Sequence, residues 1–444
     1  MTIAQLKQII ADAGIVGAGG AGFPTAVKVA EGADTLLINA SECEPLLYTD
    51  YTLIRDRIET VAAGAEAVMA AAGIKQGFLG FKMYRAGLIG LKDGQQISEH
   101  VRVRLLPNVY PMGDEVILIY QMLHRIVPPG QLPLSVGVLV FNSETLYNIA
   151  MAVREQAPVT EKWITVSGEV RHPFVAHVPV GTPVAELMRR YDVTVPDDFV
   201  MIDGGPAMGR IINPATAVIT KTTKGLLVLP ANIPAIRNRM ATDRTVMTHA
   251  SANCCQCTLC TDLCPRALIG YPLHPHKIVR NSMAMIEENP ELFTEATMCS
   301  GCGVCELTSC CQEISPRRVY TKVKAVLAKN KLKYQPQGEL TPNPDREYRL
   351  LPSSRFKRMI GVSPYDHFVP EYTENTWTPD TVRLPLRQHI GAPAKATVNA
   401  GDHVSRGQVV AAADGVISAN IHASVSGEVV AVSATEITIR TARS

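Results

Sequence analysis

The cysteines between positions 254 and 311 carry the clearest chemistry in the sequence. Ten of the 11 cysteines fall in this stretch, and the first run is Cys254-x-x-Cys257-x-x-Cys260-x-x-x-Cys264-Pro265. Two-residue spacers let successive thiolates converge on one [4Fe–4S] cluster, whereas the fourth cysteine of such a run usually ligates the other cluster of a two-cluster ferredoxin. The run therefore predicts a second cluster motif elsewhere in the chain.

The second run is Cys299-x-x-Cys302-x-x-Cys305, followed after a four-residue spacer by Cys310. We predict two [4Fe–4S] clusters whose ligands cross between the runs. Cluster 1 is assigned Cys254, Cys257, Cys260 and Cys310, and cluster 2 is assigned Cys299, Cys302, Cys305 and Cys264. Cys255 and Cys311 are left over beside predicted ligands, so the sequence leaves open whether Cys310 or Cys311 binds the metal.

Structural zinc is the main alternative for a cysteine-rich segment. Zinc sites take four ligands, commonly from paired C-x-x-C knuckles, and not from triplets of cysteines followed by Cys-Pro. The pattern therefore favours iron–sulfur clusters over zinc. Cys43 stands alone near the N-terminus and is expected to be a small buried residue.

The composition is that of a multidomain globular protein with several cores, because 46% of the 444 residues are apolar and 19% are charged. The net charge of +2 is spread without basic clusters, which disfavours nucleic acid and anionic membranes as partners. The N-terminus lacks a signal sequence, and the apolar run over 61–74 is too short to span a bilayer. We expect a cytoplasmic protein without membrane insertion.

A glycine-rich loop, Gly17-Ala-Gly19-Gly20-Ala-Gly22, satisfies the G-x-G-x-x-G pattern. A helix precedes this loop, so the context is not that of a Rossmann strand. Consecutive glycines allow backbone N–H groups to approach a phosphate, and the helix expected from Pro24 directs its positive end there. The loop predicts either a phosphate-bearing cofactor or a tight turn between helices.

Further motifs in the first 150 residues are more specific than the glycines. They are Asn39-Ala-Ser-Glu-Cys-Glu-Pro, Tyr110-Pro-Met-Gly-Asp-Glu and Asn142-Ser-Glu-Thr. Together with the glycine loop they resemble the FMN- and NADH-binding signature of the flavoprotein subunit of respiratory complex I and of RnfC. Ser41 stands where complex I flavoproteins usually have Asp, and Asp114 stands where they usually have Glu.

The resemblance implies that FMN and NADH bind to these motifs. The residues implied for FMN are Gly17, Gly19, Gly20, Lys28, Asn39, Ser41, Glu42, Tyr110, Gly113, Asp114, Asn142 and Thr145. Those implied for NADH are Phe23, Glu44 and Glu115. No residue is assigned acid–base catalysis, because the cofactors carry the redox chemistry.

The fold class expected is multidomain α/β. Residues 1–158 are expected to form an FMN/NADH-binding α/β domain (the flavin domain), and 159–235 resemble a soluble-ligand-binding β-grasp (SLBB) domain. Residues 240–335 are expected to form a helical ferredoxin-like domain with both clusters (the cluster domain), including a helix over Lys277–Glu288. Residues 336–385 are expected to be an extended surface linker, and 386–444 resemble the barrel-sandwich fold of lipoyl carriers (the C-terminal domain). That domain lacks the carrier lysine between its two halves.

In RnfC the barrel-sandwich module precedes the flavin domain, whereas here it follows the clusters. This order and the cysteine spacing resemble the cobalamin reductases of bacterial microcompartments. The resemblance implies electron transfer from NADH through FMN and two [4Fe–4S] clusters to cob(III)alamin or cob(II)alamin, inside a microcompartment. It also implies possible contact with shell or adenosyltransferase proteins. The alternative is an RnfC-like electron-transfer subunit that serves another redox carrier or protein.

Overall fold

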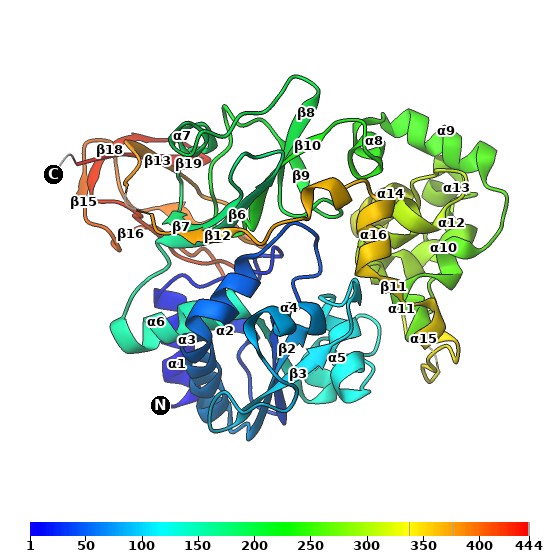
Figure 1. Ribbon diagram of the computed structural model, residues 1–444, viewed down its shortest axis with the longest axis horizontal. Coiled ribbons are helices and arrows are strands. Elements are labelled where there is room, and N and C mark those ends of the chain that lie inside the picture. The colour runs from blue at the N-terminus through cyan, green and yellow to red at the C-terminus, as the bar shows by residue number, and fades with distance from the viewer. Residues whose placement is uncertain (337, 376, 443–444) are drawn as a thin grey trace.

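The computed structural model describes residues 1–336, 338–375 and 377–442. Its first part is a four-stranded parallel sheet with the order β3-β2-β1-β5 (Figure 1). The strands are β1 (Thr35–Asn39), β2 (Gln76–Lys82), β3 (Val101–Leu106) and β5 (Val138–Asn142). The helices of this part are α1 (Ile3–Asp12), α2 (Thr25–Lys28), α3 (Thr49–Ala72), α4 (Met83–Ile89), α5 (Glu115–Leu123), η1 (Pro133–Val136) and α6 (Ser143–Glu155).

Each face of this sheet packs against a different set of helices. Helices α1, α3 and α6 share one hydrophobic core with the sheet. A Cβ at Gly64 of α3 would lie 1.9 Å from the Leu146 carbonyl oxygen, so only glycine permits the approach of α3 to α6. Helix α5 covers the other face, and its core continues without a break into the helices that carry the cysteines. The flavin domain and the cluster domain therefore share a core.

The next part is a mixed sheet with the order β12-β7-β6-β10-β8-β9, crossed by helix α7 (Val184–Arg190). Its strands are β6 (Glu161–Gly168), β7 (Phe174–Pro179), β8 (Phe199–Asp203), β9 (Arg210–Ile212), β10 (Gly225–Pro230) and β12 (Glu371–Thr373). Five of these strands lie in the segment 159–235, which resembles a β-grasp domain. Strand β12 comes from far along the chain and pairs in parallel with β7.

The cysteine segment is helical, but its helices are short. They are α8 (Pro234–Met240), α9 (Asp243–Asn253), α10 (Leu259–Asp262), α11 (Pro265–Leu268), α12 (Pro275–Ile278), α13 (Met283–Glu288), η2 (Pro290–Met298), η3 (Cys305–Ser309) and α14 (Pro316–Lys329). The single helix expected over Lys277–Glu288 is wrong, because α12 ends at Ile278 and a new helix begins at Met283 with Ser282 as its N-cap. The Ser282 side chain accepts a hydrogen bond from the Met285 N–H, which starts a second helix.

The segment 336–385, expected to be an extended linker, contains several short helices and strands. It contains α15 (Arg346–Arg349), β11 (Leu351–Pro352), α16 (Ser353–Met359), η4 (Ser363–Tyr365), β12 and β13 (Thr381–Pro385). Strand β11 pairs with β4 (Val109–Tyr110), and Phe356 of α16 is fully buried. The sparse apolar residues of this segment therefore pack against three other parts of the molecule.

The C-terminal part consists of two small antiparallel sheets that enclose one core. Their strands are β13, β14 (Lys395–Ala396), β15 (His403–Val404), β16 (Val409–Ala412), β17 (Ile421–His422), β18 (Gly427–Val432) and β19 (Glu436–Thr441). Strand β13 pairs with β19, so this fold begins before position 386. No helix in the described residues is both long and apolar enough to cross a membrane.

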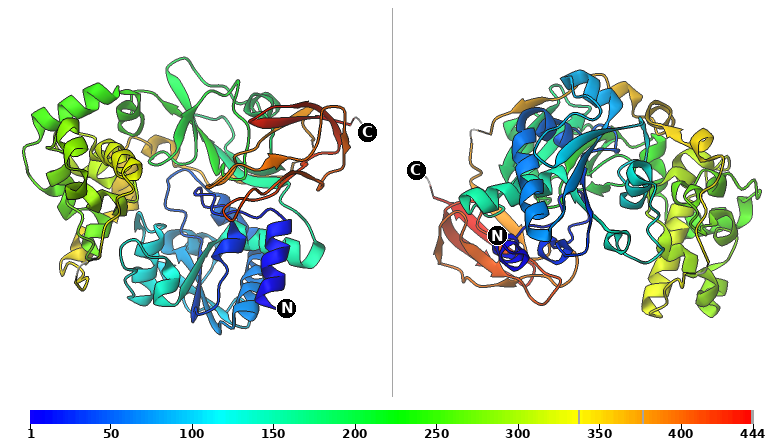
Figure 2. Two further views of the ribbon diagram at one scale, coloured as in Figure 1. Left: turned by 180° about the vertical axis from the view of Figure 1, so that it is seen from behind. Right: turned by 90° about the horizontal axis from the view of Figure 1, so that it is seen from below.

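The C-terminal domain lies beside the N-terminal segment in both views of Figure 2. Lys221 of the β-grasp domain joins them, because its Nζ donates to the Gly14 and Asn420 carbonyl oxygens, each at 2.7 Å. No carboxylate in the described residues pairs with this ammonium, and burial lowers the pKa of Lys221 to about 7. The contact is therefore more favourable when Lys221 is neutral.

This arrangement predicts that raising the pH stabilises the domain contact. Between pH about 7 and the unfolded pKa of about 10.4, the unfolded chain holds a proton that folded Lys221 has lost, so stability rises with pH in this window. Relative to Lys221→Met, the parent should gain about 1 kcal/mol per pH unit, measured by thermal unfolding from pH 7.5 to 9.5. Lys75→Met, at an exposed position, is the control. A difference between the parent and Lys221→Met that does not change with pH would contradict the prediction.

Candidate functional site

The structure brings the eight predicted cluster ligands together in two sets. Cys254, Cys257, Cys260 and Cys310 line one cavity, which Cys255 and Cys311 also line. Cys264, Cys299, Cys302 and Cys305 line a second cavity. Each set contains one cysteine from the other run, which is the crossed arrangement that the spacing predicts. The helix ends position them: Cys254 follows α9, Cys264 precedes α11, and η3 separates Cys305 from Cys310.

The donor sets fit iron–sulfur clusters chemically. Burial and the neighbouring thiols raise the pKa of Cys260 to about 12 and that of Cys264 to about 11. The pKa values of Cys302 and Cys305 are raised in the same way, first by burial. Four converging thiols in such surroundings become thiolates only when a cationic centre compensates their charge, as the iron atoms of a cluster do.

Cys255 and Cys311, the surplus cysteines, lie at the outer edge of the first set. With Cys257 they form an exposed trio whose sulfur atoms all lie within 4.8 Å of one another. Cys311 lies 3.8 Å from Cys255 and 3.9 Å from Cys257, measured between sulfur atoms. Cys310 is half-buried and lies close enough to the buried Cys260 to help raise its pKa, whereas Cys311 is exposed. We therefore propose Cys310 as the ligand from the second run.

Tyr110 connects the second set of cysteines to the flavin domain. Its hydroxyl lies 2.7 Å from the Cys302 carbonyl oxygen, to which it donates, and its ring stacks on Phe356 with centroids 3.9 Å apart. Nearby, Arg266 binds both carboxylate oxygens of Asp114 at 2.9 and 3.1 Å and donates to the Met298 carbonyl. Such a bidentate ion pair fixes position as well as charge. Asp114 is thus engaged with the cluster domain.

The glycine loop lies beside the ends of β1 and β5. The Thr145 hydroxyl accepts a hydrogen bond from the Ala18 N–H at 3.0 Å, and Gly19 lies against Asn142. Asn39 Nδ2 donates to the Gly113 carbonyl at 3.0 Å, and Asn39 Oδ1 accepts from the Ser41 hydroxyl. These are the carboxyl ends of parallel strands, where open α/β sheets bind ligands.

The loop has room for a phosphate group. A Cβ at Gly20 would meet no atom within 4 Å, and Gly20 has a φ of +103°, which favours glycine. Lys28 lies at the same edge, but its Nζ pairs with Glu115 at 2.6 Å. At Gly113 a Cβ would lie 2.9 Å from the Ser41 hydroxyl, so glycine is required for this turn to approach β1. The backbone therefore suits the predicted FMN phosphate.

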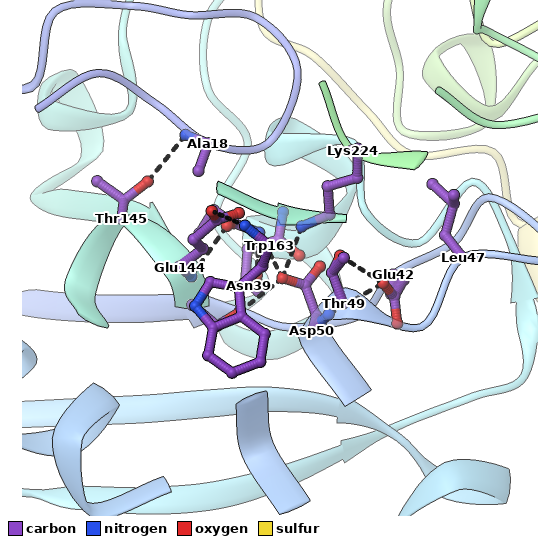
Figure 3. Close-up of polar contacts among 12 residues, drawn as sticks. Ala18, Asn39, Glu42, Leu47, Thr49, Asp50, Glu144, Thr145, Trp163 and Lys224 are labelled. Carbon is purple, nitrogen blue, oxygen red and sulfur yellow. Dashed lines mark hydrogen bonds and ion pairs between the residues drawn. The ribbon is translucent and has the colours of Figure 1, made fainter. Parts of the chain in front are cut away.

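Glu42, predicted to contact FMN, is engaged within the protein. Its carboxylate accepts from the Thr49 hydroxyl and from the backbone N–H of Asp50 (Figure 3). It also accepts from the Tyr51 N–H and pairs with Arg85. Acceptors at a helix N-terminus are stabilising, so Glu42 caps α3. The motif alone did not indicate this structural role.

Asp50 and Lys224 form a buried ion pair that the sequence did not indicate, with Nζ 2.7 Å from Oδ1. Asn142 and Ser143 also donate to Asp50. Burial raises the pKa of Asp50, but the Lys224 ammonium and these hydrogen bonds outweigh it and lower the net value. The pair attaches the β-grasp domain to the flavin domain. The only advance signal was Thr49-Asp50 at the start of a long helix.

The three residues predicted for NADH are not joined to one another by any hydrogen bond or ion pair in the described part of the chain. Glu115 pairs with Lys28. Glu44 contacts the Tyr110 hydroxyl at 3.1 Å and accepts from the Ala207 N–H at 2.9 Å. Burial raises the pKa of Glu44, and Phe23 is half-buried after the glycine loop. Their role toward NADH stays a prediction.

Three protein-family models match separate parts of the chain. Residues 10–151 match the Nuo51 FMN-binding domain, and residues 253–315 match a 4Fe-4S dicluster domain. Residues 368–443 match the RnfC barrel sandwich hybrid domain. The predicted multidomain α/β fold class, with these domains in this order, is confirmed.

Among curated proteins, the chain is 41% identical to the cobalamin reductase PduS of Citrobacter freundii, over 98% of this chain and 96% of that protein. It is 32% identical to a component of the ion-translocating oxidoreductase complex of Edwardsiella ictaluri, over 62% of this chain and 34% of that component. Among solved structures, an NAD+-reducing [NiFe]-hydrogenase in the H2-reduced state matches with 20% identity and a TM-score of 0.45. That match covers 75% of this chain and 63% of the other.

The ligand assignment predicts different outcomes for two adjacent cysteines. Cys310→Ala should lose or convert cluster 1, with iron falling from about eight toward about four per chain, because it removes a buried thiolate. Cys311→Ala should keep both clusters. The measurement is iron content and EPR of the dithionite-reduced protein, prepared without oxygen. If Cys311→Ala loses the cluster and Cys310→Ala keeps it, the ligand is Cys311.

FMN occupancy should depend on the glycine loop and on Lys28 without affecting iron. Lys28→Ala should weaken FMN binding roughly tenfold or more, because a charged hydrogen bond to phosphate is lost. Gly19→Trp should exclude FMN, since its side chain would fill the space beside Asn142. Lys75→Ala is the control. Flavin and iron are measured on the same samples, and equal loss of both would indicate misfolding instead of a local effect.

Proposed function

The chain belongs to the family of the cobalamin reductase PduS, and we propose that it is an NADH-dependent oxidoreductase that reduces a corrinoid through FMN and two [4Fe–4S] clusters. The match to an FMN-binding domain supports the oxidation of NADH by a flavin. The match to a 4Fe-4S dicluster domain supports the transfer of single electrons through clusters. The corrinoid comes from the name of the relative, which covers nearly the same length.

FMN, when bound, converts the two electrons of a hydride into single electrons that [4Fe–4S] clusters accept. The chain's own contribution is to hold and orient the groups. We assign phosphate binding to Gly17, Gly19, Gly20 and Lys28. The ring system is assigned to Asn39, Ser41, Gly113, Asn142 and Thr145, which lie together at the strand ends. Glu42 acts by fixing the start of α3.

The observation that carries this proposal is the attachment of cluster 2 to the flavin domain. The Tyr110–Cys302 hydrogen bond and the Arg266–Asp114 ion pair come from residues of the same two motifs that the flavin and cluster predictions rest on. A shared hydrophobic core holds these domains in a fixed position. We therefore assign cluster 2 as the first cluster to receive electrons.

Basic side chains lie around the cluster 2 cysteines. Arg266 and Arg317 are paired with Asp114 and Glu306, whereas Lys324 forms no ion pair in the described residues. Lys324 donates to the Cys299 carbonyl, Arg266 donates to the Met298 carbonyl, and Arg317 lines the cavity of the second cysteine set. Positive charge near a cluster stabilises its more negative, reduced state. Cluster 1 is closer to solvent, since Cys257 is exposed. This difference supports transfer from cluster 2 toward cluster 1 or an external acceptor.

The exposed cysteines at cluster 1 also favour a second candidate, an electron-transfer subunit like RnfC that serves a protein partner. An exposed cluster suits contact with another redox protein. For the corrinoid reductase we further propose a location in a bacterial microcompartment, next to shell or adenosyltransferase proteins. A neighbouring diol dehydratase gene would support the corrinoid, and a neighbouring glycyl-radical enzyme gene would support the alternative.

The proposal predicts that NADH oxidation requires the flavin but cluster reduction does not. A flavin-free Gly19→Trp protein should fail to oxidise NADH, while dithionite still reduces its clusters because it delivers single electrons. Stopped-flow absorbance at the flavin and cluster bands measures both. NADH oxidation at the parent rate by this variant would exclude FMN as the entry point.

Removing cluster ligands should have the opposite effect. Cys257→Ala with Cys302→Ala should leave rapid reduction of the flavin by NADH but abolish reduction of cobalamin. Cys255→Ala, which removes a surplus cysteine, is the matched control. If the double variant reduces cobalamin as fast as the parent, the clusters lie off the path and reduced flavin is the direct reductant.

A further inference from the structure

An arginine-lined pocket lies where the β-grasp domain meets the cluster domain. It is an open cavity of about 340 Å³, lined by Arg239, Arg317, Arg318, Thr321 and Gly301, with Met208 and Gly209 from a β-grasp loop. No acidic side chain is among its lining residues. None of its lining residues is assigned to the flavin site or is a cysteine, although it shares Gly301 and Arg317 with the cavity of the cluster 2 cysteines. Three guanidinium groups with a hydroxyl are a donor set for an anion.

Arg239 is the least neutralised of these arginines. It donates to two neutral acceptors, the Gly209 carbonyl at 2.7 Å and the Pro206 carbonyl at 2.6 Å. These two hydrogen bonds use two of the five N–H groups of Arg239. Arg239 forms no ion pair within the described residues. Burial and the nearby Arg317 lower the pKa of Arg239 to about 10. An anion bound beside Arg239 would compensate the charge of this partly buried guanidinium and so lower its free energy.

The other two arginines are only partly neutralised. Arg317 pairs with the buried Glu306, and Arg318 pairs with Asp243 at 2.7 Å. Asp243 is shared with Lys322, so the acidic groups near the pocket are outnumbered by the basic ones. Arg317 donates from Nε and Nη2 to Glu306, each at 3.1 Å, and from Nη1 to the Ala207 carbonyl, which leaves two of its five N–H groups for the pocket. The net charge at this site is positive.

The position of the pocket connects it to electron transfer. Gly301 and Arg317 line both this pocket and the cavity of the cluster 2 cysteines. Pro316, the residue before Arg317, lines the cavity of the cluster 1 cysteines. The pocket therefore adjoins the cavity of the cluster 2 cysteines directly and reaches that of the cluster 1 cysteines only through the neighbouring residues Pro316 and Arg317. Met208, which is 53% exposed, offers an apolar contact at the rim.

We propose that this pocket binds the phosphodiester of the corrinoid's nucleotide tail. The inference rests on the proposed function, because it names where the acceptor is held. A phosphodiester is a compact monoanion whose oxygens match guanidinium N–H groups. The pocket is too small for a whole corrinoid but is open to solvent, so the corrin ring stays outside, against Met208. Free phosphate offers the same anionic oxygens, and the binding experiment below distinguishes it from the corrinoid.

The test compares binding of two corrinoids to the oxidised holoenzyme by calorimetry, without turnover. Cobalamin carries the phosphodiester tail, and cobinamide lacks it. The parent should bind cobalamin more tightly, and Arg239→Gln should weaken cobalamin about tenfold while leaving cobinamide unchanged. Inorganic phosphate should compete with cobalamin only. Arg237→Gln, on the same helix but paired with Glu313, is the matched control and should change neither.

Arg239→Lys distinguishes charge from structure, because Arg239 also supports the β-grasp loop. It should retain most cobalamin affinity. Equal loss of both corrinoids in Arg239→Gln, or an equal effect of Arg237→Gln, would overturn the inference. So would a parent that binds phosphate in the pocket but does not distinguish cobalamin from cobinamide. If the parent reduces cobalamin under these outcomes, the proposed function stands and only the pocket assignment fails. If the parent neither binds nor reduces any corrinoid, both fail.

Discussion

Tyr110 joins the predicted flavin domain to the second set of cysteines and to the segment that follows them. Its hydroxyl bonds to the Cys302 carbonyl, its ring stacks on Phe356, and its strand pairs with β11. A rigid contact of this kind would fix the separation between the predicted flavin site and the cluster 2 cysteines, and with it the rate of electron transfer between cofactors bound there. The segment after the clusters, residues 351–359, is required for it, since Phe356 forms the other side of the stack.

Two buried ion pairs attach the β-grasp domain to the flavin domain. Lys224 pairs with Asp50, and Lys162 pairs with Glu144, all at positions with little solvent contact. Removing one partner of such a pair leaves an uncompensated buried charge and is strongly destabilising. These pairs therefore specify one orientation of the β-grasp domain. That orientation places its 205–209 loop against Glu44 and beside the arginine pocket.

The parts of the site that the sequence could predict are those set by local spacing. The cysteine runs predicted which thiols share a cavity, although Cys255 and Cys311 also line the first one, and the glycine pattern left a phosphate site and a tight turn as alternatives. Contacts between distant residues had no such signal. Arg266 and Asp114 are 152 positions apart, and nothing near either residue indicates the other. For the same reason Phe356, a single aromatic residue in a polar stretch, read as part of a linker, although burial against Tyr110 makes it structural.

The central claim is that one chain holds a flavin and two iron–sulfur clusters. The most direct measurement is the content of iron, acid-labile sulfide and FMN in protein purified or reconstituted without oxygen. The account predicts about eight iron atoms, about eight sulfides and about one FMN per chain. A colourless protein containing zinc after the same reconstitution, or one with about four iron atoms, would contradict it.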